Sequence, residues 1–539
     1  MKLPLLVTEF LRRARSLYPA ATAAVCGDQR LTYRALGERI DRFSSALEEL
    51  GVTRGDVVAY LSFNCHRLLE AYYAVPQIGA VLLPVNIRLT AKDIAYILND
   101  AQAKVVVIDR RLADLLAPVR SELSFVQQVV LMGGEAAEAC GLVGHDYESL
   151  IAGASAWTHD PEIGEDDVAE LFYTSGTTAD PKGVQLTHRN LYLHALYAII
   201  GLSGYDDHCV QLHTIPLFHV NGWGTPHFVT LIGGRHVLLP KFDPEDVLAT
   251  IEREWVTHVF LVPTMATALM SAPSFATADL SSLRRIKLGG AAAPPSVVRR
   301  LSERLPHCHI AAGYGLSETS PILTAADIKA GLNPTAEESA RIRSTAGLPL
   351  PGVHLEILND ANQPVPHDGS SAGEICVRSN VVTAGYLNLP DDTARAFAGG
   401  WFHTGDMGTI DDQGYVSIVD RKKDIIVTGG ENVASLEIEK AIHEHPAVME
   451  CAVIALPDPV WGEIPAAIVV RKPGVSLDEA EILKHCRSHL AHFKAPRRVF
   501  FLDALPKGGT GKILKRELRQ RFLQPVAGQA TAVSSPAQP

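Results

Sequence analysis

Residues 173–183 concentrate the groups that bind phosphate. They include one serine, three threonines, two glycines, a proline and Lys182, and they follow an apolar run at 168–173. A chain that leaves a buried strand for such a segment exposes N–H and O–H donors together, which suits the oxygens of a polyphosphate. The glycines allow close approach of the backbone, and Lys182 adds a compact positive charge. We therefore expect a loop that binds nucleotide phosphates.

This segment differs from the phosphate loop of P-loop NTPases. Pro181 stands where that motif has its second glycine, and Gly183 stands where it has the serine or threonine that binds magnesium. A second glycine-rich run at 508–512 also differs from the P-loop motif, because Pro506 occupies the position of the first glycine. An ordinary polar surface loop is the alternative for any single Ser/Thr/Gly-rich segment.

A second cluster at 313–319 could hold a purine and a metal ion. Tyr314 offers a flat aromatic face between Gly313 and Gly315. Glu318 offers a hard oxygen ligand for Mg²⁺ beside phosphates. Taken alone, the two side chains are as easily a core tyrosine and a solvated glutamate.

Length and composition limit the function classes. A chain of 539 residues exceeds the roughly 250–300 residues at which one core stops growing, so at least two domains are expected. The net charge of −11 argues against a general nucleic-acid surface. The eight cysteines are scattered without a CxxC pair or a Cys/His cluster, so neither a disulfide framework nor a structural zinc site is indicated, and a reducing cytoplasm fits.

The N-terminus and the apolar runs favour a soluble protein. Leu3 to Val7 are apolar, but Glu9 and three arginines follow, so an amphipathic first helix is expected rather than a signal peptide. No uninterrupted apolar stretch approaches the ~20 residues of a membrane span. We expect no integral membrane segment, and peripheral membrane association stays open.

The first 300 residues alternate strand-like and helical patterns, which predicts an α/β fold with largely parallel sheets covered on both faces. Two similar α/β units in series are the simplest interpretation. The expected strands are 56–61, 80–85, 104–109, 209–215, 236–239, 259–262 and 286–288, and the expected helices are 67–78, 91–98, 246–255 and 296–305.

The secondary-structure pattern of the sequence changes after about Ser344. Short alternating segments broken by turn residues predict a small β subdomain, with a hairpin across 411–414. The charge cluster at 420–424, which alone resembles a solvated turn, is the expected domain boundary. We expect an N-terminal domain at 1–420, an α+β domain at 421–523 and a disordered tail at 524–539. In the second domain, Ser435 and a Ser476/Glu479 capping box are expected to begin helices.

The order TSGTT then PKG at 174–183 resembles the signature loop of the adenylate-forming (ANL) superfamily, and 314–318 matches its Y-G-x-[ST]-E motif. The resemblance covers about residues 10–520. It implies a large N-terminal domain of two α/β sheet subdomains and a β-barrel-like subdomain, followed by a small mobile α+β domain. It also implies an AMP-binding acyl-CoA synthetase, which joins a carboxylic acid to AMP from ATP, releases pyrophosphate, and then forms the CoA thioester.

The resemblance assigns roles by position in the motifs. Asp406 would hold the ribose hydroxyls, Arg421 would contact ribose and phosphate, and Lys423 would be the hinge between domains. Lys512, in P-K-x-x-x-G-K, matches the catalytic lysine. The full nucleotide set is Thr174, Ser175, Gly176, Thr177, Thr178, Lys182, Gly290, Ala291, Ala292, Gly313, Tyr314, Gly315, Ser317, Glu318, Asp406, Val419, Arg421 and Lys512. The catalytic set is Lys512, Glu318, Thr174 and His219, with Mg²⁺ expected on Glu318 and Thr174.

Residues 216–224 resemble the acyl site of medium- and long-chain fatty-acid ligases and contain no Lys or Arg to pair with a second carboxylate. Trp223 could gate an apolar tunnel, although a core tryptophan is an equal alternative. The expected acyl-site residues are His219, Val220, Gly222, Trp223, Gly289 and Gly315. The expected CoA-binding residues are Gly429, Gly430 and Glu431.

The expected substrates are ATP with Mg²⁺, CoA and an aliphatic acid of medium or long chain. Small thioether or aromatic acids, or an acceptor other than CoA, are the alternatives. A binding protein without catalysis would have lost Lys512 or Glu318, and both are present. No nucleic-acid partner is expected, and a homodimer stays open.

Overall fold

The computed structural model describes residues 3–133, 143–158, 161–174, 181–508 and 513–523. The chain divides into two compact units, which we describe separately. The larger unit holds Met1–Thr404 and Gly408–Ile418, and the smaller unit holds Gly405–Met407, Val419–Gly508 and the described residues after 512. No helix of the described chain is both long enough and apolar enough to cross a membrane.

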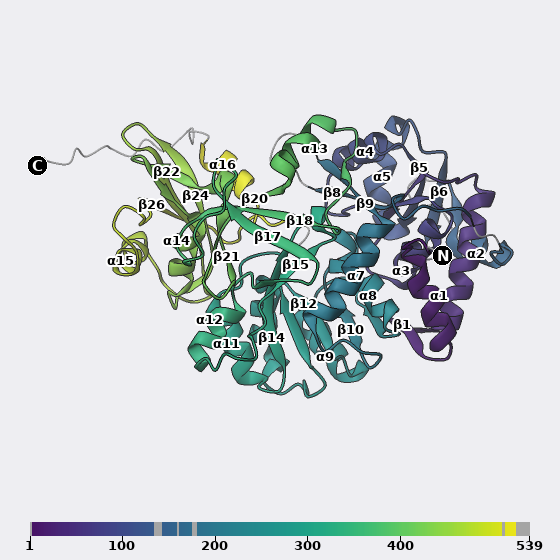
Figure 1. The fold of residues 1–539 in the computed structure, drawn as a ribbon, viewed down its shortest axis with the longest axis horizontal. Coiled ribbons are helices and arrows are strands. Elements are labelled where there is room, and N and C mark those ends of the chain that lie inside the picture. The colour runs from purple at the N-terminus through teal and green to yellow at the C-terminus, as the bar shows by residue number, and fades with distance from the viewer. Residues whose placement is uncertain (1–2, 134–142, 159–160, 175–180, 509–512, 524–539) are drawn as a thin grey trace, which may run out of the picture. The chain divides into compact units, whose positions relative to one another are not determined.

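An eight-stranded sheet in the larger unit carries the strand that enters the phosphate loop (Figure 1). Its order is β19-β9-β8-β4-β3-β5-β6-β7, parallel from β8 to β7. The central strands β3 to β6 are almost wholly buried because helices cover both faces. The strands are β3 (Val57–Leu61), β4 (Val81–Pro84), β5 (Ala103–Asp109), β6 (Gln128–Met132), β7 (His145–Asp146), β8 (Val168–Thr174), β9 (Lys182–Thr187) and β19 (Gly385–Tyr386).

A nine-stranded sheet completes the α/β part, in the order β16-β15-β14-β13-β12-β10-β11-β1-β2. Its strands are β1 (Thr22–Cys26), β2 (Gln29–Thr32), β10 (Val210–His213), β11 (Arg235–Leu238), β12 (His258–Leu261), β13 (Arg285–Leu288), β14 (His309–Gly315), β15 (Ile322–Ala325) and β16 (Leu348–Pro349). The two sheets are therefore not built strictly in series. The N-terminal hairpin β1–β2 joins the second sheet, where Ala24 pairs with His236. Local sequence patterns do not predict such a long-range pairing.

The helices of the larger unit confirm the expected α/β alternation. They are α1 (Thr8–Leu17), α2 (Tyr33–Glu49), α3 (His66–Gln77), α4 (Ala91–Asp100), α5 (Ala113–Leu116), α6 (Tyr147–Gly153), α7 (His188–Leu202), α8 (Val220–Leu231), α9 (Pro244–Glu254), α10 (Pro263–Ser271), α11 (Pro295–Arg304), α12 (Ala336–Arg343) and α13 (Pro390–Ala396). Thr187 begins α7 with a capping box to Asn190, which fixes the chain directly after β9.

The small β subdomain is a four-stranded sheet in the order β17-β18-β20-β21. Its strands are β17 (Val353–Leu358), β18 (Gly373–Ser379), β20 (Phe402–Ile410) and β21 (Val416–Arg421). The predicted hairpin across 411–414 is confirmed, because β20 and β21 are neighbours on either side of it.

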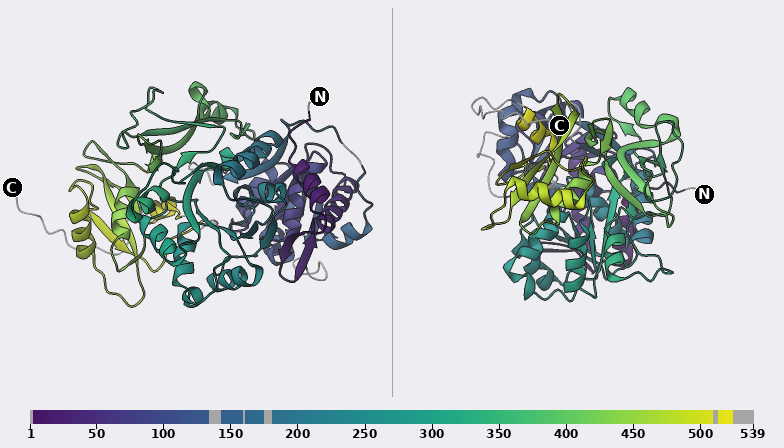
Figure 2. Two further views of the ribbon diagram at one scale, coloured as in Figure 1. Left: turned by 60° about the horizontal axis from the view of Figure 1, so that its bottom comes forward. Right: turned by 90° about the vertical axis from the view of Figure 1, so that its left-hand side faces the viewer.

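The smaller unit is a five-stranded sheet covered by helices on both faces (Figure 1, Figure 2). Along β24, Cys451 and Val453 face α14 and α15, whereas Ala452 and Ile454 face α16, as the alternation of a strand requires. The elements are β22 (Ile426–Thr428), β23 (Glu431–Val433), β24 (Val448–Asp458), β25 (Gly462–Arg471), β26 (Arg498–Phe501), α14 (Ser435–His443), α15 (Glu479–His489) and α16 (Lys515–Leu523).

Two predicted helix caps in this unit are wrong. Ser435 is the first residue of α14 rather than its cap, because its hydroxyl donates to the buried Asp420 carboxylate at 2.7 Å. The capping box of α15 is formed by Asp478 and Glu481 instead of Ser476 and Glu479. In both cases a nearby carboxylate is the stronger acceptor for the backbone N–H groups.

Candidate active site

The phosphate loop connects two antiparallel strands. Thr174, the last residue of β8, pairs with Lys182, the first of β9. The Lys182 amine lies 2.9 Å from an Asp392 carboxylate oxygen and 5.3 Å from the centroid of the Tyr386 ring. These contacts hold a positive charge at the base of the loop. Four expected phosphate-binding residues lie outside the described residues, namely Ser175, Gly176, Thr177 and Thr178.

Tyr386 links this lysine to the candidate metal ligand. Strand β19 pairs with β9, which sets Tyr386 opposite Val184. The Tyr386 hydroxyl donates to Oε1 of Glu318 at 3.0 Å. Burial, and then the negative charge of Glu318, raise the pKa of Tyr386 above its ordinary value, so the phenol keeps its proton and remains a donor. Sequence reasoning missed both Tyr386 and Asp392, because neither belongs to a motif used above.

The Glu318 carboxylate fits a magnesium ligand. Glu318 and Ser317 lie in a 3₁₀ turn, Ser317–Thr319, directly after β14, and both are half-buried. A carboxylate has about four lone-pair positions, so Glu318 can accept the Tyr386 hydrogen bond and also bind a hard cation. The donor set is therefore compatible with Mg²⁺ on Glu318, with the Thr174 hydroxyl as the second expected ligand.

Tyr314 is more deeply packed than a free purine platform would be. It is 9% exposed and belongs to a buried apolar cluster with Leu323 and Phe402. The flanking glycines serve the pairing of β14 with β15, because a Cβ on Gly315 would lie 1.7 Å from the carbonyl oxygen of Pro321. On Gly313 it would lie 2.8 Å from a backbone oxygen.

The small-residue segment after β13 touches the acyl-site tryptophan. A Cβ on Gly289 would lie 3.1 Å from two ring atoms of Trp223, so the indole rests on this glycine. Gly290 has φ of +74°, Ala291 is exposed and Ala292 is half-buried. The structure thus places the segment that holds three expected nucleotide-binding residues, 290–292, directly after the glycine that contacts the expected acyl-site tryptophan.

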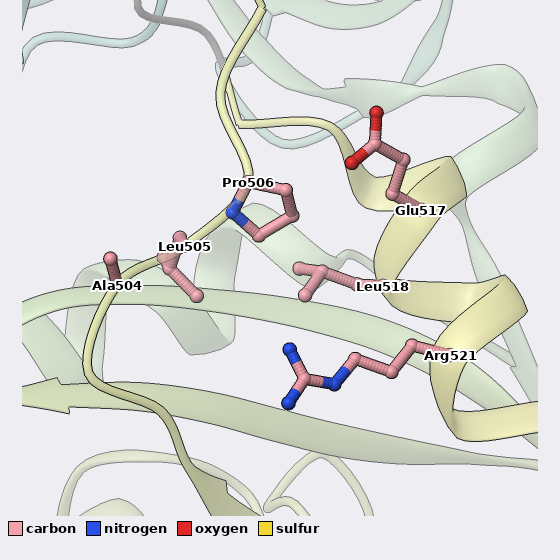
Figure 3. Close-up of a pocket in the computed structure, with 6 residues that line it drawn as sticks. All are labelled: Ala504, Leu505, Pro506, Glu517, Leu518 and Arg521. Carbon is pink, nitrogen blue, oxygen red and sulfur yellow. The ribbon is translucent and has the colours of Figure 1, made fainter.

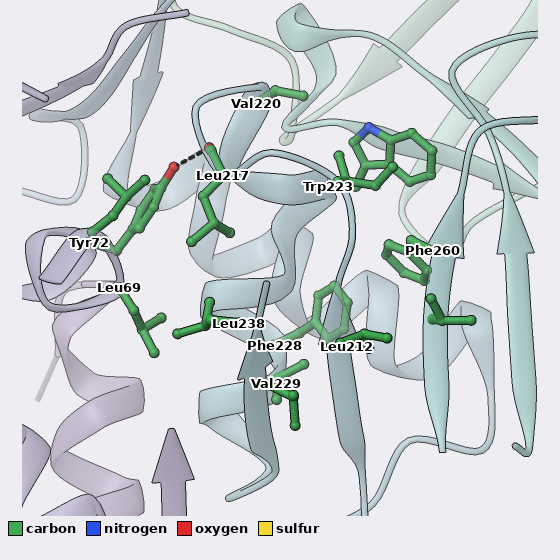
Figure 4. Close-up of a cluster of buried hydrophobic side chains, with 14 of the residues drawn as sticks. Leu69, Tyr72, Leu212, Leu217, Val220, Trp223, Phe228, Val229, Leu238 and Phe260 are labelled. Atoms are coloured by element: carbon green, nitrogen blue, oxygen red, sulfur yellow. Dashed lines mark hydrogen bonds between the residues drawn. The ribbon is translucent and has the colours of Figure 1, made fainter. Parts of the chain in front are cut away.

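The acyl-site segment begins α8 with a left-handed turn. Five consecutive residues, from Val220 to Gly224, have φ between 34° and 85°. His219 precedes this turn and is half-buried, while Val220 and Gly222 are buried. The turn directs Trp223 toward Phe260, with ring centroids 5.6 Å apart, and leaves it 8% exposed within the apolar cluster of Figure 4.

A buried polar network holds the turn. The Asn221 side chain accepts from the backbone N–H of Gly224 at 2.6 Å and donates to Oε2 of Glu170 at 2.8 Å. The other Glu170 oxygen lies 2.5 Å from Nε2 of His227, and Glu170 has no exposed surface. Because Glu170 lies on β8, the strand that enters the phosphate loop also supports the acyl-site turn. Sequence reasoning missed this network; the only signal was a glutamate inside an otherwise apolar strand.

In the smaller unit, two expected ribose-binding residues form an ion pair. Nε of Arg421 lies 2.8 Å from Oδ1 of Asp406, which is buried, while Arg421 is exposed. The charge cluster at 420–424 is only partly a solvated turn, because Asp420 and Asp424 are buried and the basic residues between them are exposed. Lys423, the expected hinge, lies in the 3₁₀ turn Lys422–Asp424, and Val419 is half-buried. Lys512 lies outside the described residues.

The expected CoA-binding residues form an exposed turn in the same unit. Gly429 and Gly430 connect β22 to β23 with φ of +59° and +86°, and Glu431 follows them. The N–H of Gly429 donates to the carbonyl of Trp461 at 2.9 Å, and a Cβ on Gly429 would lie 2.8 Å from the indole. Trp461 itself stacks under the Arg497 guanidinium at 4.2 Å, and the motifs did not indicate it.

A separate hollow of about 420 Å³ lies between residues 504–506 and α16 (Figure 3). Among the described residues that line it, Glu517 and Arg521 carry charge, and none of these described residues is assigned above.

Similar proteins share both the sequence and the fold of this chain. The profile of the AMP-binding enzyme family matches residues 11–387, and that of the AMP-binding enzyme C-terminal domain matches residues 437–512. A long-chain-fatty-acid–CoA ligase of Thermus thermophilus is 38% identical over 524 residues, with 95% of each chain covered. A feruloyl-CoA synthase of an Amycolatopsis species is 38% identical over 513 residues, covering 95% of this chain and 98% of that protein.

Among solved structures, ATP-bound MatB from Rhodopseudomonas palustris matches with a TM-score of 0.86 and 30% identity. The match covers 96% of this chain and 99% of that chain. Proteins named for an aliphatic and for an aromatic acid are thus equally similar in sequence to this one.

Proposed function

Because the chain belongs to the family of AMP-binding enzymes and is an acyl-CoA ligase, an acid–thiol ligase, we propose that its acid is a medium- or long-chain fatty acid. The observation that carries this proposal is the packing of Trp223, which rests on Gly289 and faces Phe260. The segment at 216–224 offers no Lys or Arg to a second carboxylate. An apolar wall without a countercharge favours an aliphatic tail over a diacid.

In the first half-reaction, a carboxylate oxygen of the acid attacks the α-phosphorus of ATP. The new O–P bond forms as the bond to the bridging oxygen breaks, and pyrophosphate leaves with that electron pair. The nucleophile is already ionised, so no general base is needed, and positioning with positive charge supplies most of the catalysis. We assign Lys182 and the 174–182 loop to the pyrophosphate end, and Lys512 to the carboxylate and α-phosphate oxygens.

Glu318 and Thr174 would hold Mg²⁺, which when bound neutralises charge on the phosphates. Tyr386 orients the Glu318 carboxylate through its 3.0 Å hydrogen bond. His219 is assigned to the carboxylate end of the acyl site, between the turn at 220–224 and the nucleotide.

In the second half-reaction, the sulfur of CoA attacks the acyl carbonyl carbon and its S–H proton passes to solvent. The C–S bond forms as the C–O bond to AMP breaks, and AMP leaves with that electron pair. The exposed Gly429–Gly430 turn, with the Trp461 indole beside it, supports a role in binding the pantetheine arm. Asp406 and Arg421 would hold the ribose and phosphate of AMP.

The decisive experiment measures pyrophosphate release over a panel of carboxylic acids, with and without CoA. The panel contains saturated acids of increasing chain length, cinnamate-type acids, thioether acids and a diacid. A fatty-acid ligase gives the highest kcat/KM with medium- or long-chain acids and forms their CoA thioesters. Preference for any other class would refute the proposed substrate, and release without thioester formation would refute the acceptor.

An aromatic acid is the second candidate. The tilted Trp223–Phe260 ring pair could enclose an aryl group as well as an alkyl chain, and a feruloyl-CoA synthase is among the similar proteins. The same panel separates the two, because a cinnamate-type acid would then exceed every saturated acid in kcat/KM.

A further inference from the structure

Three side chains that can bind a metal ion meet on the small β sheet, and none of them is among the residues assigned above. Glu374 and Cys376 lie two residues apart on β18 and therefore on the same face, and His403 lies on the neighbouring strand β20. One ligand atom from each lies within 4.8 Å of the others. Cys376 has no exposed surface, whereas the His403 and Glu374 side chains are 17% and 12% exposed, so solvent reaches one side of the group.

The hydrogen bonds of His403 restrict its protonation. Nε2 lies 3.1 Å from the carbonyl oxygen of Ala398, which can only accept, so Nε2 carries a proton. In the neutral ring, Nδ1 then presents a lone pair, and this atom lies 3.3 Å from a Glu374 oxygen and 3.4 Å from the Cys376 sulfur. Nδ1 therefore turns its lone pair toward the sulfur and the carboxylate oxygen, an arrangement that suits a cation held between the three groups.

The spacing of the atoms matches a metal site. Zn–S bonds of about 2.3 Å and Zn–N or Zn–O bonds of about 2.0–2.1 Å place tetrahedral ligand atoms about 3.3–3.6 Å apart. The separations of Nδ1 from the Glu374 oxygen and from the Cys376 sulfur, 3.3 and 3.4 Å, agree with that edge length. The bond from Nε2–H to a backbone carbonyl is the interaction that orients a metal-binding histidine.

We propose that Glu374, Cys376 and His403 form a binding site for a borderline divalent cation such as Zn²⁺, with water as the fourth ligand. A thiolate and a carboxylate together balance the charge of the ion, and the neutral imidazole adds a third bond. Sulfur and imidazole ligands select Zn²⁺ or Co²⁺ over Mg²⁺, so the site is chemically distinct from Glu318. The sequence did not suggest it, because the three residues share no metal-binding spacing.

Binding exchanges a proton for the metal. The Cys376 S–H bond breaks, its electron pair forms the metal–sulfur bond, and the proton passes to solvent. The bound ion would join β18 to β20 at His403, which lies three residues before Asp406 in the sequence. This inference does not depend on the identity of the acid, and its test does not use activity.

The test titrates Co²⁺ into the full chain after dialysis against a chelator. A thiolate ligand gives sulfur-to-cobalt charge-transfer absorption in the near ultraviolet, and we expect it to saturate at one ion per chain. Binding of Co²⁺ or Zn²⁺ to the metal-free chain should release one proton from Cys376, and Zn²⁺ added to the Co²⁺-loaded chain should remove the band without further proton release. Either ion should raise the melting temperature of the metal-free chain by mass action. Absence of the band, or binding to the metal-free chain without proton release, would overturn the proposal.

Variants identify the ligands. Cys376→Ser should abolish the charge-transfer band. Glu374→Gln and His403→Gln, both at partly exposed positions, should each weaken Zn²⁺ binding by about 100-fold or more. Groups that only orient a metal ligand typically contribute 10- to 100-fold, so this larger loss identifies direct ligands. Cys486→Ser removes an equally buried thiol from the smaller unit, and His354→Gln removes a histidine beside Glu356 on β17. Both controls should bind normally, and a band that survives in Cys376→Ser would disprove the site.

Discussion

At the scale of single residues, Tyr386 has the most consequential position that the motifs did not indicate. Its ring lies beside the Lys182 amine and its hydroxyl binds Glu318, so one side chain connects the phosphate loop with the candidate metal ligand. Because its pKa is raised, this donor persists above the pH at which an exposed tyrosine ionises.

Tyr386→Phe tests that connection. Loss of a hydrogen bond to a charged group costs about 1.5–3 kcal/mol, so we expect kcat/KM for MgATP to fall about 10-fold or more. The half-saturating Mg²⁺ concentration should rise, measured by pyrophosphate release. Tyr415→Phe is the matched control, because its hydroxyl donates to the Asp327 carbonyl, away from the assigned site. Equal effects of the two variants would remove Tyr386 from the active site.

Trp223→Ala tests the acyl wall. The substitution removes the ring that rests on Gly289, so the ranking of acids by kcat/KM should shift toward bulkier or longer tails while the KM for ATP changes little. Trp255→Ala, at a site 66% exposed, should leave the ranking unchanged. An unaltered ranking in Trp223→Ala would exclude this residue from the acyl site.

At the scale of elements, the left-handed turn at 220–224 is unusual because non-glycine residues in this conformation are strained. Such strain persists only where surrounding contacts determine it. The contacts are those of Asn221, which bonds Gly224 within the turn and Glu170 on β8. A fully buried carboxylate therefore supports the geometry of the acyl site.

Asn221→Ala should be costly for this reason. It leaves one oxygen of Glu170 and the N–H of Gly224 without their partner, and we expect about 3 kcal/mol lower stability of the larger unit in urea unfolding. The acid profile should broaden as Trp223 loses its fixed orientation. Asn99→Ala breaks two exposed bonds, one donated to the Glu122 carbonyl and one accepted from the Ser124 N–H, and should cost about 1 kcal/mol or less. Similar losses in both variants would contradict a special role for Asn221.

The same elements show what sequence patterns can predict. Strands and helices with a clear period, such as β3, α3 and β5, are predicted to within one residue at each end, because burial of alternate or helical positions is a local property. Placement of β1 beside β11, and of Tyr386 beside Lys182, depends on pairings between distant segments that no local pattern encodes. The turn at 220–224 was signalled only by its glycines, since the Asn221–Glu170 bond that fixes it is tertiary.

At the scale of the whole molecule, neutral buried histidines link stability to pH. Burial lowers the pKa of at least five histidines in the larger unit to about 3 or about 4, whereas an unfolded histidine titrates near 6.5. They include His66, His188, His194, His213 and His258.

The sign of the effect follows from proton binding. Between about pH 6.5 and pH 4 the unfolded chain holds protons that the folded chain does not, so stability falls as the pH falls through this window. At pH 5 these five groups alone should take up about five protons on unfolding. Melting temperatures of the larger unit, measured from pH 8 to pH 5, should decline below pH 7. A flat profile would show that the histidines are solvated in the folded chain.

The two half-reactions make different demands on the molecule, and we expect Lys512 to act in the first of them only. As the amine assigned to the carboxylate and α-phosphate oxygens, it stabilises charge only while the O–P bond forms. Lys512→Ala should therefore reduce pyrophosphate release by at least about 100-fold, since a charged contact in the transition state is worth several kcal/mol. Thioester formation from supplied acyl-AMP and CoA should stay near the wild-type rate, because no phosphorus bond to pyrophosphate breaks in that step.

Lys494→Ala is the control for net charge. It removes one positive charge from the smaller unit, at the ion pair with Glu437, and should leave both rates unchanged. Equal loss of both half-reactions in Lys512→Ala would mean that this lysine supports the fold or both steps, and the assignment to adenylate formation would then be wrong.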